Sequence, residues 1–204
     1  MPEPLTPAEL RVLGALLEKE STTPEYYPLT LNALVAACNQ KSNRYPVTEY
    51  SDDDVLSAID RLRSRGFAAM ITGSRATRYA QRFTEKLNLG RRETAILCVL
   101  MLRGQQTVGE IKGRTERVYE FADLDEVETV IVRMGDMVQK LAPAPGMKEP
   151  RYAQTLGGPV DATAAAQPQP LSSGNDRLAS LEEEVAHLRE EVADLRRRLE
   201  EVLS

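Results

Sequence analysis

The tetrapeptide Arg-Tyr-Ala-Gln occurs twice in this chain, at residues 78–81 and again at residues 151–154. In both places it falls in the last strand of a segment that is predicted to begin with an amphipathic helix and to end with a hairpin. Identical residues at matching positions of two similar segments indicate an internal duplication. We therefore expect two modules of one fold, over residues 1–84 and 85–156.

In the first copy, the helix boundaries are marked by capping residues. Thr6, Thr30 and Ser51 are predicted to begin three helices, because an N-cap hydroxyl accepts a backbone N–H that the first turn leaves unpaired. Gly66 is predicted to end the third helix. Residues 67–72 and 77–83 then have the composition of two strands joined by a turn, which predicts a hairpin.

The second copy repeats this order. A helix is expected over residues 89–102, and Thr107 and Asp123 are predicted to cap the two helices that follow. Tyr79 and Tyr152 occupy matching strand positions and are expected in the core. Three helices with a short extended segment and a hairpin are typical of a winged helix. The expected fold class is α+β, mainly α, with two tandem winged-helix modules followed by a C-terminal coiled-coil helix.

A run of polar side chains follows the second helix of the first copy, whose apolar residues form one helical stripe. Two interpretations of this run are open. It can satisfy its own backbone as an ordered turn, or it can face phosphate, peptide or another polar partner. The candidate contact residues are Asn39, Gln40, Lys41, Asn43 and Arg44, with Arg75 and Arg78 on or beside the hairpin.

The same stretch carries a family resemblance. Residues 17–47, which include EKE, TTP, YPL, LNAL and ACNQKSNR, resemble the signature of the bacterial YceH-like family, and the likeness covers about residues 5–156. The resemblance implies two winged-helix modules in tandem and brings no established activity. It adds specificity to the five residues of the polar run without assigning them a role.

The C-terminal region differs from both modules. Residues 157–176 are rich in Gly, Pro, Ala, Gln and Ser and are expected to form a flexible linker. Apolar residues with alternating spacings of three and four then predict a coiled coil over residues 177–204. Its flanking charges attract in a parallel pair and repel in a centred antiparallel pair, so we expect a parallel homodimer, with a helix of another protein as the alternative. The apolar positions are Leu178, Leu181, Val185, Leu188, Val192, Leu195, Leu199 and Val202.

Several protein classes are excluded by composition and by missing motifs. No apolar run approaches the roughly 18 residues of a membrane span, and the first residues lack the features of a signal peptide, so we expect a cytoplasmic protein. Cys38 and Cys98 each fall on an apolar helical face and are expected as buried thiols. The single histidine, His187, is expected on the surface of the coil. Without a nucleophile, phosphate-loop or metal-ligand motif, we expect no enzymatic activity, no cofactor and no metal site.

Charge distribution leaves two functional hypotheses open. Basic and acidic residues balance within each module, so the net charge of −5 belongs to the tail. Binding of double-stranded DNA through the polar run and the hairpin is the first hypothesis. It is favoured by these basic residues of the first module: Lys41, Arg44, Arg61, Arg63, Arg65, Arg75, Arg78 and Arg82. The second module contributes Lys112, Arg114 and Arg117.

The start of each third helix argues against ordinary docking of that helix in a DNA groove. Residues 52–54 and 123–128 place carboxylates where base-reading side chains would enter, and phosphate repels them. The second hypothesis is therefore a protein-interaction scaffold. Its architecture is similar to that of the chromosome-segregation protein ScpB, with which this chain shares no sequence match. The basic hairpin favours the first hypothesis, and the neutral modules with acidic helix starts favour the second.

Overall fold

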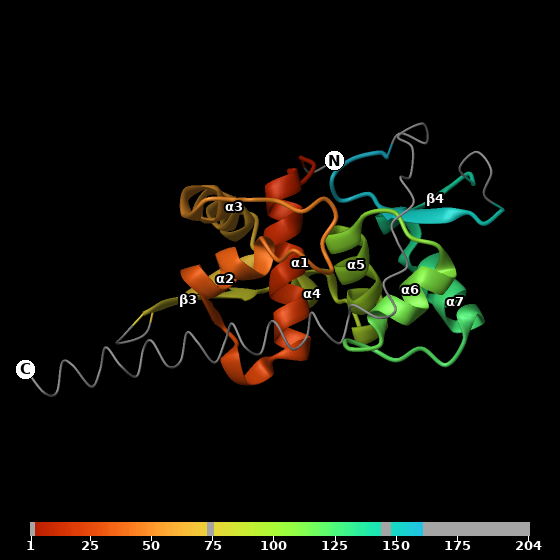
Figure 1. The fold of residues 1–204 in the computed structure, drawn as a ribbon, viewed down its shortest axis with the longest axis horizontal. Coiled ribbons are helices and arrows are strands. Elements are labelled where there is room, and N and C mark those ends of the chain that lie inside the picture. The colour runs from red at the N-terminus through yellow and green to blue at the C-terminus, as the bar shows by residue number, and fades with distance from the viewer. Residues whose placement is uncertain (1–2, 73–75, 144–147, 161–204) are drawn as a thin grey trace, which may run out of the picture. The chain divides into compact units, whose positions relative to one another are not determined.

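The structure is a computed structural model that describes residues 3–72, 76–143 and 148–160 (Figure 1). Arg75, the linker from residue 161 onward, His187 and all the coiled-coil positions from Leu178 to Val202 lie outside the described residues. The predictions made for them therefore stay predictions.

The first copy contains helices, a three-stranded antiparallel sheet and the capping residues that its sequence predicts. Thr6 and Ser51 form capping boxes with Glu9 and Asp54, and Thr30 accepts a hydrogen bond from the N–H of Ala33, so all three predicted helix starts are confirmed. The sheet has the order β1-β3-β2. The elements are α1 (Pro7–Thr22), η1 (Pro24–Tyr26), β1 (Leu29–Thr30), α2 (Leu31–Cys38), α3 (Asp52–Ser64), β2 (Ala68–Thr72), β3 (Thr77–Gln81) and α4 (Phe83–Leu87).

One boundary differs from the prediction. The last strand was expected to continue to Phe83, but β3 ends at Gln81 and α4 begins at Phe83. The side chain of Gln81 accepts a hydrogen bond from the backbone N–H of Thr84 at 3.0 Å, which turns the chain into a helix. Phe83 thereby enters the core, where it is fully buried and its ring lies 5.2 Å from that of Phe67.

The second copy has the same order with a smaller sheet. Thr107 and Asp123 cap their helices as predicted. The first helix begins at Arg91 rather than at residue 89, because Asn88 adopts a left-handed conformation and Gly90 becomes the N-cap. Only an isolated bridge between Gln106 and Tyr152 replaces the third strand among the described residues. The elements are α5 (Arg91–Arg103), α6 (Val108–Thr115), α7 (Leu124–Met134), η2 (Gly135–Met137), β4 (Val138–Leu141) and β5 (Arg151–Gln154).

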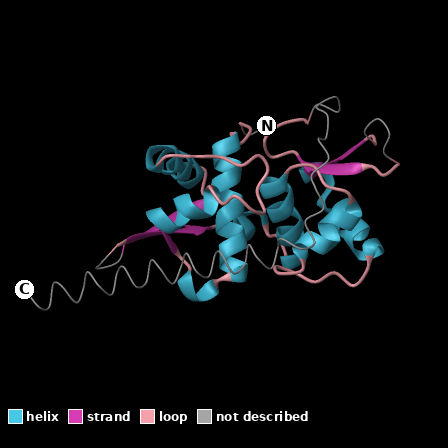
Figure 2. Ribbon diagram, viewed as in Figure 1, coloured by secondary structure: helices cyan, strands magenta, loops and turns pink. Residues whose placement is uncertain are grey.

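The two copies share one continuous core. The first helices of the copies, α1 and α5, pack directly against each other, and Gly14 allows the close approach, since a Cβ there would lie 2.9 Å from Leu102 Cδ2. Figure 2 shows the two small sheets on opposite sides of this helical centre. The mixed, mainly helical class agrees with the prediction, while the winged-helix arrangement and the boundary at residue 84 stay predictions.

The repeated tetrapeptide is used in two ways. Tyr79 and Tyr152 are each 6% exposed, which confirms that both belong to the core. The arginines have diverged: Arg78 is exposed, whereas Arg151 is buried and its guanidinium lies 2.6 Å from the carboxylate of Glu110. The predicted burial of both thiols is also confirmed, because Cys38 and Cys98 are free and buried.

Candidate interaction surfaces

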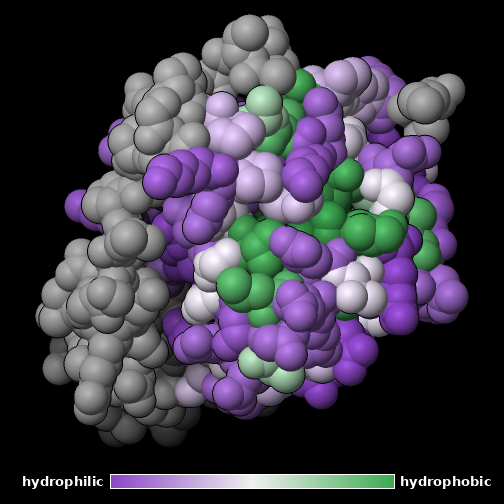
Figure 3. Space-filling view, turned by 90° about the vertical axis from the view of Figure 1, so that its right-hand side faces the viewer, coloured by the Kyte–Doolittle hydropathy of each residue, from purple (hydrophilic) through white to green (hydrophobic). Residues whose placement is uncertain are grey.

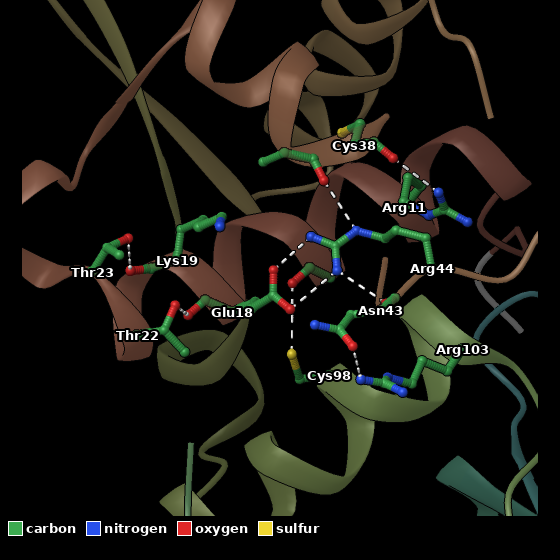
Figure 4. Close-up of polar contacts among 12 residues, drawn as sticks. Arg11, Glu18, Lys19, Thr22, Thr23, Cys38, Asn43, Arg44, Cys98 and Arg103 are labelled. Carbon is green, nitrogen blue, oxygen red and sulfur yellow. Dashed lines mark hydrogen bonds and ion pairs between the residues drawn. The ribbon is translucent and has the colours of Figure 1, made fainter. Parts of the chain in front are cut away.

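The polar run after α2 folds over a buried arginine. The side chain of Arg44 is fully buried, and its Nη1 and Nη2 donate to the two carboxylate oxygens of Glu18 at 3.0 and 2.5 Å (Figure 4). Its Nε donates to the carbonyl oxygen of Ala37 at 3.0 Å, at the end of α2. Arg44 therefore joins the loop to α1 from the inside and offers no exposed donor to a partner, so the expected partner contact does not agree with its position.

A second buried arginine, Arg11 of α1, holds the other side of the loop. Its Nη1 donates to the carbonyl oxygen of Cys38 at 2.9 Å, and its Nη2 donates to that of Pro46 at 2.6 Å. Burial, together with the nearby charge of Arg44, lowers the pKa of Arg11. Burial alone would raise the pKa of Glu18, but the charge and hydrogen bonds of Arg44 hold it below its ordinary value. The Glu18 carboxylate thus pairs directly with Arg44, whereas Arg11 is held by two carbonyl oxygens and by the hydroxyl of Thr48.

Two asparagines of the run are also engaged internally. Asn39 accepts a hydrogen bond from the N–H of Tyr50 and donates to its carbonyl oxygen, both at 2.8 Å. Asn43 has a positive φ of 58°, which asparagine tolerates better than most residues, and its side-chain oxygen accepts from the guanidinium of Arg103 on α5. These contacts fix the loop to the start of α3 and to the second copy. The interpretation as an ordered turn accounts for Asn39, Asn43 and Arg44.

The remaining candidates of the polar run and hairpin lie nearer the surface. Lys41 is exposed, whereas Gln40 is half-buried and its Oε1 is buried without a hydrogen-bond partner within the described residues. Arg78 is exposed and its Nη1 donates to the carbonyl oxygen of Pro28 at 2.8 Å. Arg75 lies outside the described part of the chain. The accessible part of the predicted contact set is therefore Gln40, Lys41 and Arg78.

Other arginines of the first copy have intramolecular partners. Arg63 pairs with Asp60 at 2.7 Å, and Arg82 pairs with Glu85 at 3.2 Å. Arg65 donates to the carbonyl oxygen of Glu3 at 2.5 Å. The carboxylates of Asp60 and Glu85 partly neutralise Arg63 and Arg82, which reduces the basic field that a DNA-binding surface needs.

The carboxylates at the starts of α3 and α7 accept hydrogen bonds from backbone N–H groups. Asp54 accepts hydrogen bonds from the N–H and hydroxyl of Ser51, and these bonds lower its pKa. Asp123 caps α7, and Glu126 accepts from the N–H of Ala122 at 2.9 Å. Carboxylates therefore lie at both helix starts, where a DNA-reading helix would meet phosphate, and that of Glu126 also pairs with Arg92 at 3.0 Å.

The second copy also has a groove, lined by apolar and charged residues, that was not among the predicted surfaces. It has a volume of about 290 Å³ and lies between α7 and the β4–β5 sheet, lined chiefly by Glu128, Ile131, Val132, Val138, Lys140 and Tyr152. Val132 is 78% exposed, and Leu124, on the same helix, is 49% exposed. Figure 3 shows a band of hydrophobic atoms framed by hydrophilic atoms on the face at the right-hand side of Figure 1, where α6 and α7 lie.

A sequence signal for this groove existed but was weak. The predicted apolar side of α7 contained Val127, Ile131 and Met134, and all three are buried. Val132 lies about 100° beyond Ile131 around the helix, outside the buried arc formed by Val127, Val130, Ile131 and Met134. An apolar residue off the buried stripe is common on protein surfaces, and only its neighbours in space make it part of a groove.

Comparison with known proteins places this architecture in a family. The profile described as "Protein of unknown function, DUF480" matches residues 5–147. A UPF0502 protein of Solibacter usitatus is 53% identical over 185 residues, covering 88% of this chain and 90% of the relative. A UPF0502 protein of Citrifermentans bemidjiense is 49% identical, with 86% and 85% covered. This chain belongs to the DUF480/UPF0502 family. A more distant UPF0502 relative, from Vibrio vulnificus, is 44% identical, with 87% and 89% covered.

These three relatives carry the UPF0502 name. Membership of the UPF0502 family is compatible with the YceH-like resemblance. The family description states no function, so the surfaces of this chain have to suggest one. None of the helices in residues 3–72, 76–143 and 148–160 has the length and hydrophobicity of a transmembrane span. The same residues contain no group of three His, Cys, Asp or Glu side chains that could hold a metal ion.

Proposed function

We propose that this UPF0502 protein is a non-enzymatic cytoplasmic adaptor that binds another protein. The observation that carries the proposal is the groove beside the exposed Val132 on α7. Exposed apolar surface that is framed by polar residues is typical of protein-binding sites. Val132 and Leu124 both lie on α7 in the second copy, and both are exposed.

The organisation proposed for the adaptor is two winged-helix modules and a dimerising tail. The matching order of helices and hairpins in residues 3–160 supports the modules, with boundaries at residues 84 and 156. The heptad pattern of residues 177–204 supports a parallel homodimer. A dimer would present two copies of the groove, and paired sites strengthen binding when the partner is also paired.

The adaptor proposal is tested by affinity capture with surface variants. We would replace Val132 with Asp in the full chain and use Thr129→Asp, at another exposed position of α7, as the matched control. A protein that is retained by the wild type and by Thr129→Asp, and lost by Val132→Asp, is the expected result. Equal recovery with all three proteins would contradict a role for the groove.

DNA binding is the second candidate, because Lys41 and Arg78 are exposed on the first copy. It is measured by fluorescence anisotropy of labelled random duplex DNA at about 50 and 200 mM salt. The adaptor proposal predicts no salt-sensitive binding. Strong binding at low salt that is reduced by Lys41→Ala with Arg78→Ala, and unchanged by Lys148→Ala, would favour the DNA-binding candidate instead.

A further inference from the structure

The α7 groove has the size of a side-chain pocket rather than of a small-molecule site. Ligand sites for drug-sized molecules usually enclose about 300–1,000 Å³, whereas this groove of about 290 Å³ is at the lower limit. Its floor is apolar, formed by Ile131, Val138 and Tyr152, which are at most 8% exposed. Val132 forms an open wall. A groove of this kind accepts one or two apolar side chains of a larger partner.

The spacing of the exposed residues of α7 indicates which secondary structure the partner presents. Leu124, Glu128 and Val132 are spaced by four residues, so they follow one face of the helix over about 12 Å. Leu124 and Val132 are the apolar ends of this stripe and are both largely exposed. A second helix that packs along such a stripe meets it with apolar residues spaced by three or four.

Two opposite charges flank the apolar floor. Glu128 projects from α7, and Lys140 lies on β4, opposite Tyr152, with its ammonium group 5.9 Å from the centre of the Tyr152 ring. The groove is therefore acidic along its helix side and basic along its strand side. A complementary partner carries a cation where it passes Glu128 and an anion where it passes Lys140.

We propose that the α7 groove binds an amphipathic helix of another protein, which inserts a branched or aromatic side chain beside Val132. A basic residue of that helix faces Glu128 and an acidic residue faces Lys140. This inference rests on the proposed adaptor function and gives the partner's chemistry. The apolar anchor supplies affinity, while the two charges set the direction in which the helix lies.

The test uses a displayed library of random 14-residue helical peptides, selected against the full-length protein. Enriched peptides are synthesised and titrated into ¹⁵N-labelled protein, and their footprint is read from amide shifts in α7 and β4. We expect apolar residues at a spacing of three or four, with shifts centred on Val132, Gly135 and Lys140. Val132→Asp should weaken binding at least tenfold, because it replaces an apolar contact by a charge, while Thr129→Asp should not.

Charge reversal tests the orientation. The double variant Glu128→Lys with Lys140→Glu should bind the selected peptides several-fold more weakly and should recover affinity for peptides whose basic and acidic residues are exchanged. Failure of this recovery would overturn the proposed charge pairing. Circular dichroism and chemical denaturation of each variant check that a loss of binding does not come from unfolding.

The remaining outcomes separate this inference from the adaptor function. Enriched peptides that map elsewhere, for example to the exposed Met70 and Ile71 of β2, would overturn the groove inference and leave an adaptor role intact. A library without enrichment would overturn the groove inference, and salt-sensitive DNA binding alongside it would overturn the adaptor as well. If Val132→Asp changes the oligomeric mass in light scattering, the occupant is a second copy of this chain and the proposal of a foreign helix is wrong.

Discussion

Replacing Glu18 with Gln should strongly destabilise the protein, although the two side chains have nearly the same size. Two oxygens of Glu18 accept hydrogen bonds from the guanidinium of Arg44, and the side chain of Arg44 is fully buried. Glutamine can accept only one of these bonds, and its amide group would direct N–H donors at the other. The variant also leaves Arg44 without its counter-ion while the charge of Arg11 lies nearby.

The cost is estimated from the effect of breaking a buried ion pair, about 3–5 kcal/mol. Because Glu18 retains 17% of its side-chain exposure, water offsets part of the loss, and we expect about 3 kcal/mol. The assay is urea-induced unfolding at pH 7, followed by circular dichroism. Asp60→Asn is the matched control, since it breaks the Arg63–Asp60 pair at exposed side chains and should cost less than about 1 kcal/mol.

The effect of Glu18→Gln should depend on pH in a defined direction. The pKa of Glu18 is held below its ordinary value of 4.5, so the ionised carboxylate stabilises the fold at every pH above that value. This contribution is lost as the pH falls through the lower pKa of the folded state. The difference between the wild type and Glu18→Gln should therefore shrink below pH 4.5. A cost at pH 7 no larger than that of Asp60→Asn, or a difference that stays constant down to pH 3, would refute the reasoning.

Two further predictions concern the core. Gly14→Ala should lower the free energy of unfolding by about 1–3 kcal/mol, since the new methyl group would lie 2.9 Å from Leu102 Cδ2 where α1 meets α5. Gly113→Ala has nothing within 4 Å of its new Cβ and should instead raise the free energy of unfolding by up to about 1 kcal/mol. Equal effects of the two variants in urea unfolding would contradict this account. Burial raises the pKa of Cys38 to about 12 and also raises the pKa of Cys98. Both thiols should therefore react with Ellman's reagent at pH 8 only after the protein unfolds. Rapid modification of the native protein would show that the thiols are accessible.

The fold was more predictable than the candidate site. The helix starts at Thr6, Ser51 and Thr107 follow from hydrogen bonds between residues three apart, and such bonds need no tertiary context. The prediction failed at Phe83 because its burial against Phe67, sixteen positions earlier, helps to decide that a helix begins there. Local signals thus specified elements well wherever the deciding contacts were themselves local.

The polar run after α2 shows why the function of a segment is harder to predict from sequence than its fold. Its sequence permitted either an ordered turn or a binding surface, since Asn, Lys and Arg side chains serve both. Glu18 and Arg103, which bind Arg44 and Asn43, lie 26 and 60 residues away in the chain, so no local pattern could reveal that these side chains are occupied. A second buried arginine, Arg11, was likewise recognisable only from its partners.

The sequence by itself predicted the duplication from a repeated tetrapeptide, the capped helices from residues three apart, and the burial of Tyr79 and Tyr152 from the alternation of side chains along a strand. Only the tertiary structure decided that Arg44 belongs to the interior and that Val132 belongs to an exposed groove. Whether a charged side chain meets water or a counter-ion, and whether an apolar one meets the core or solvent, depends on which distant segments pack beside it.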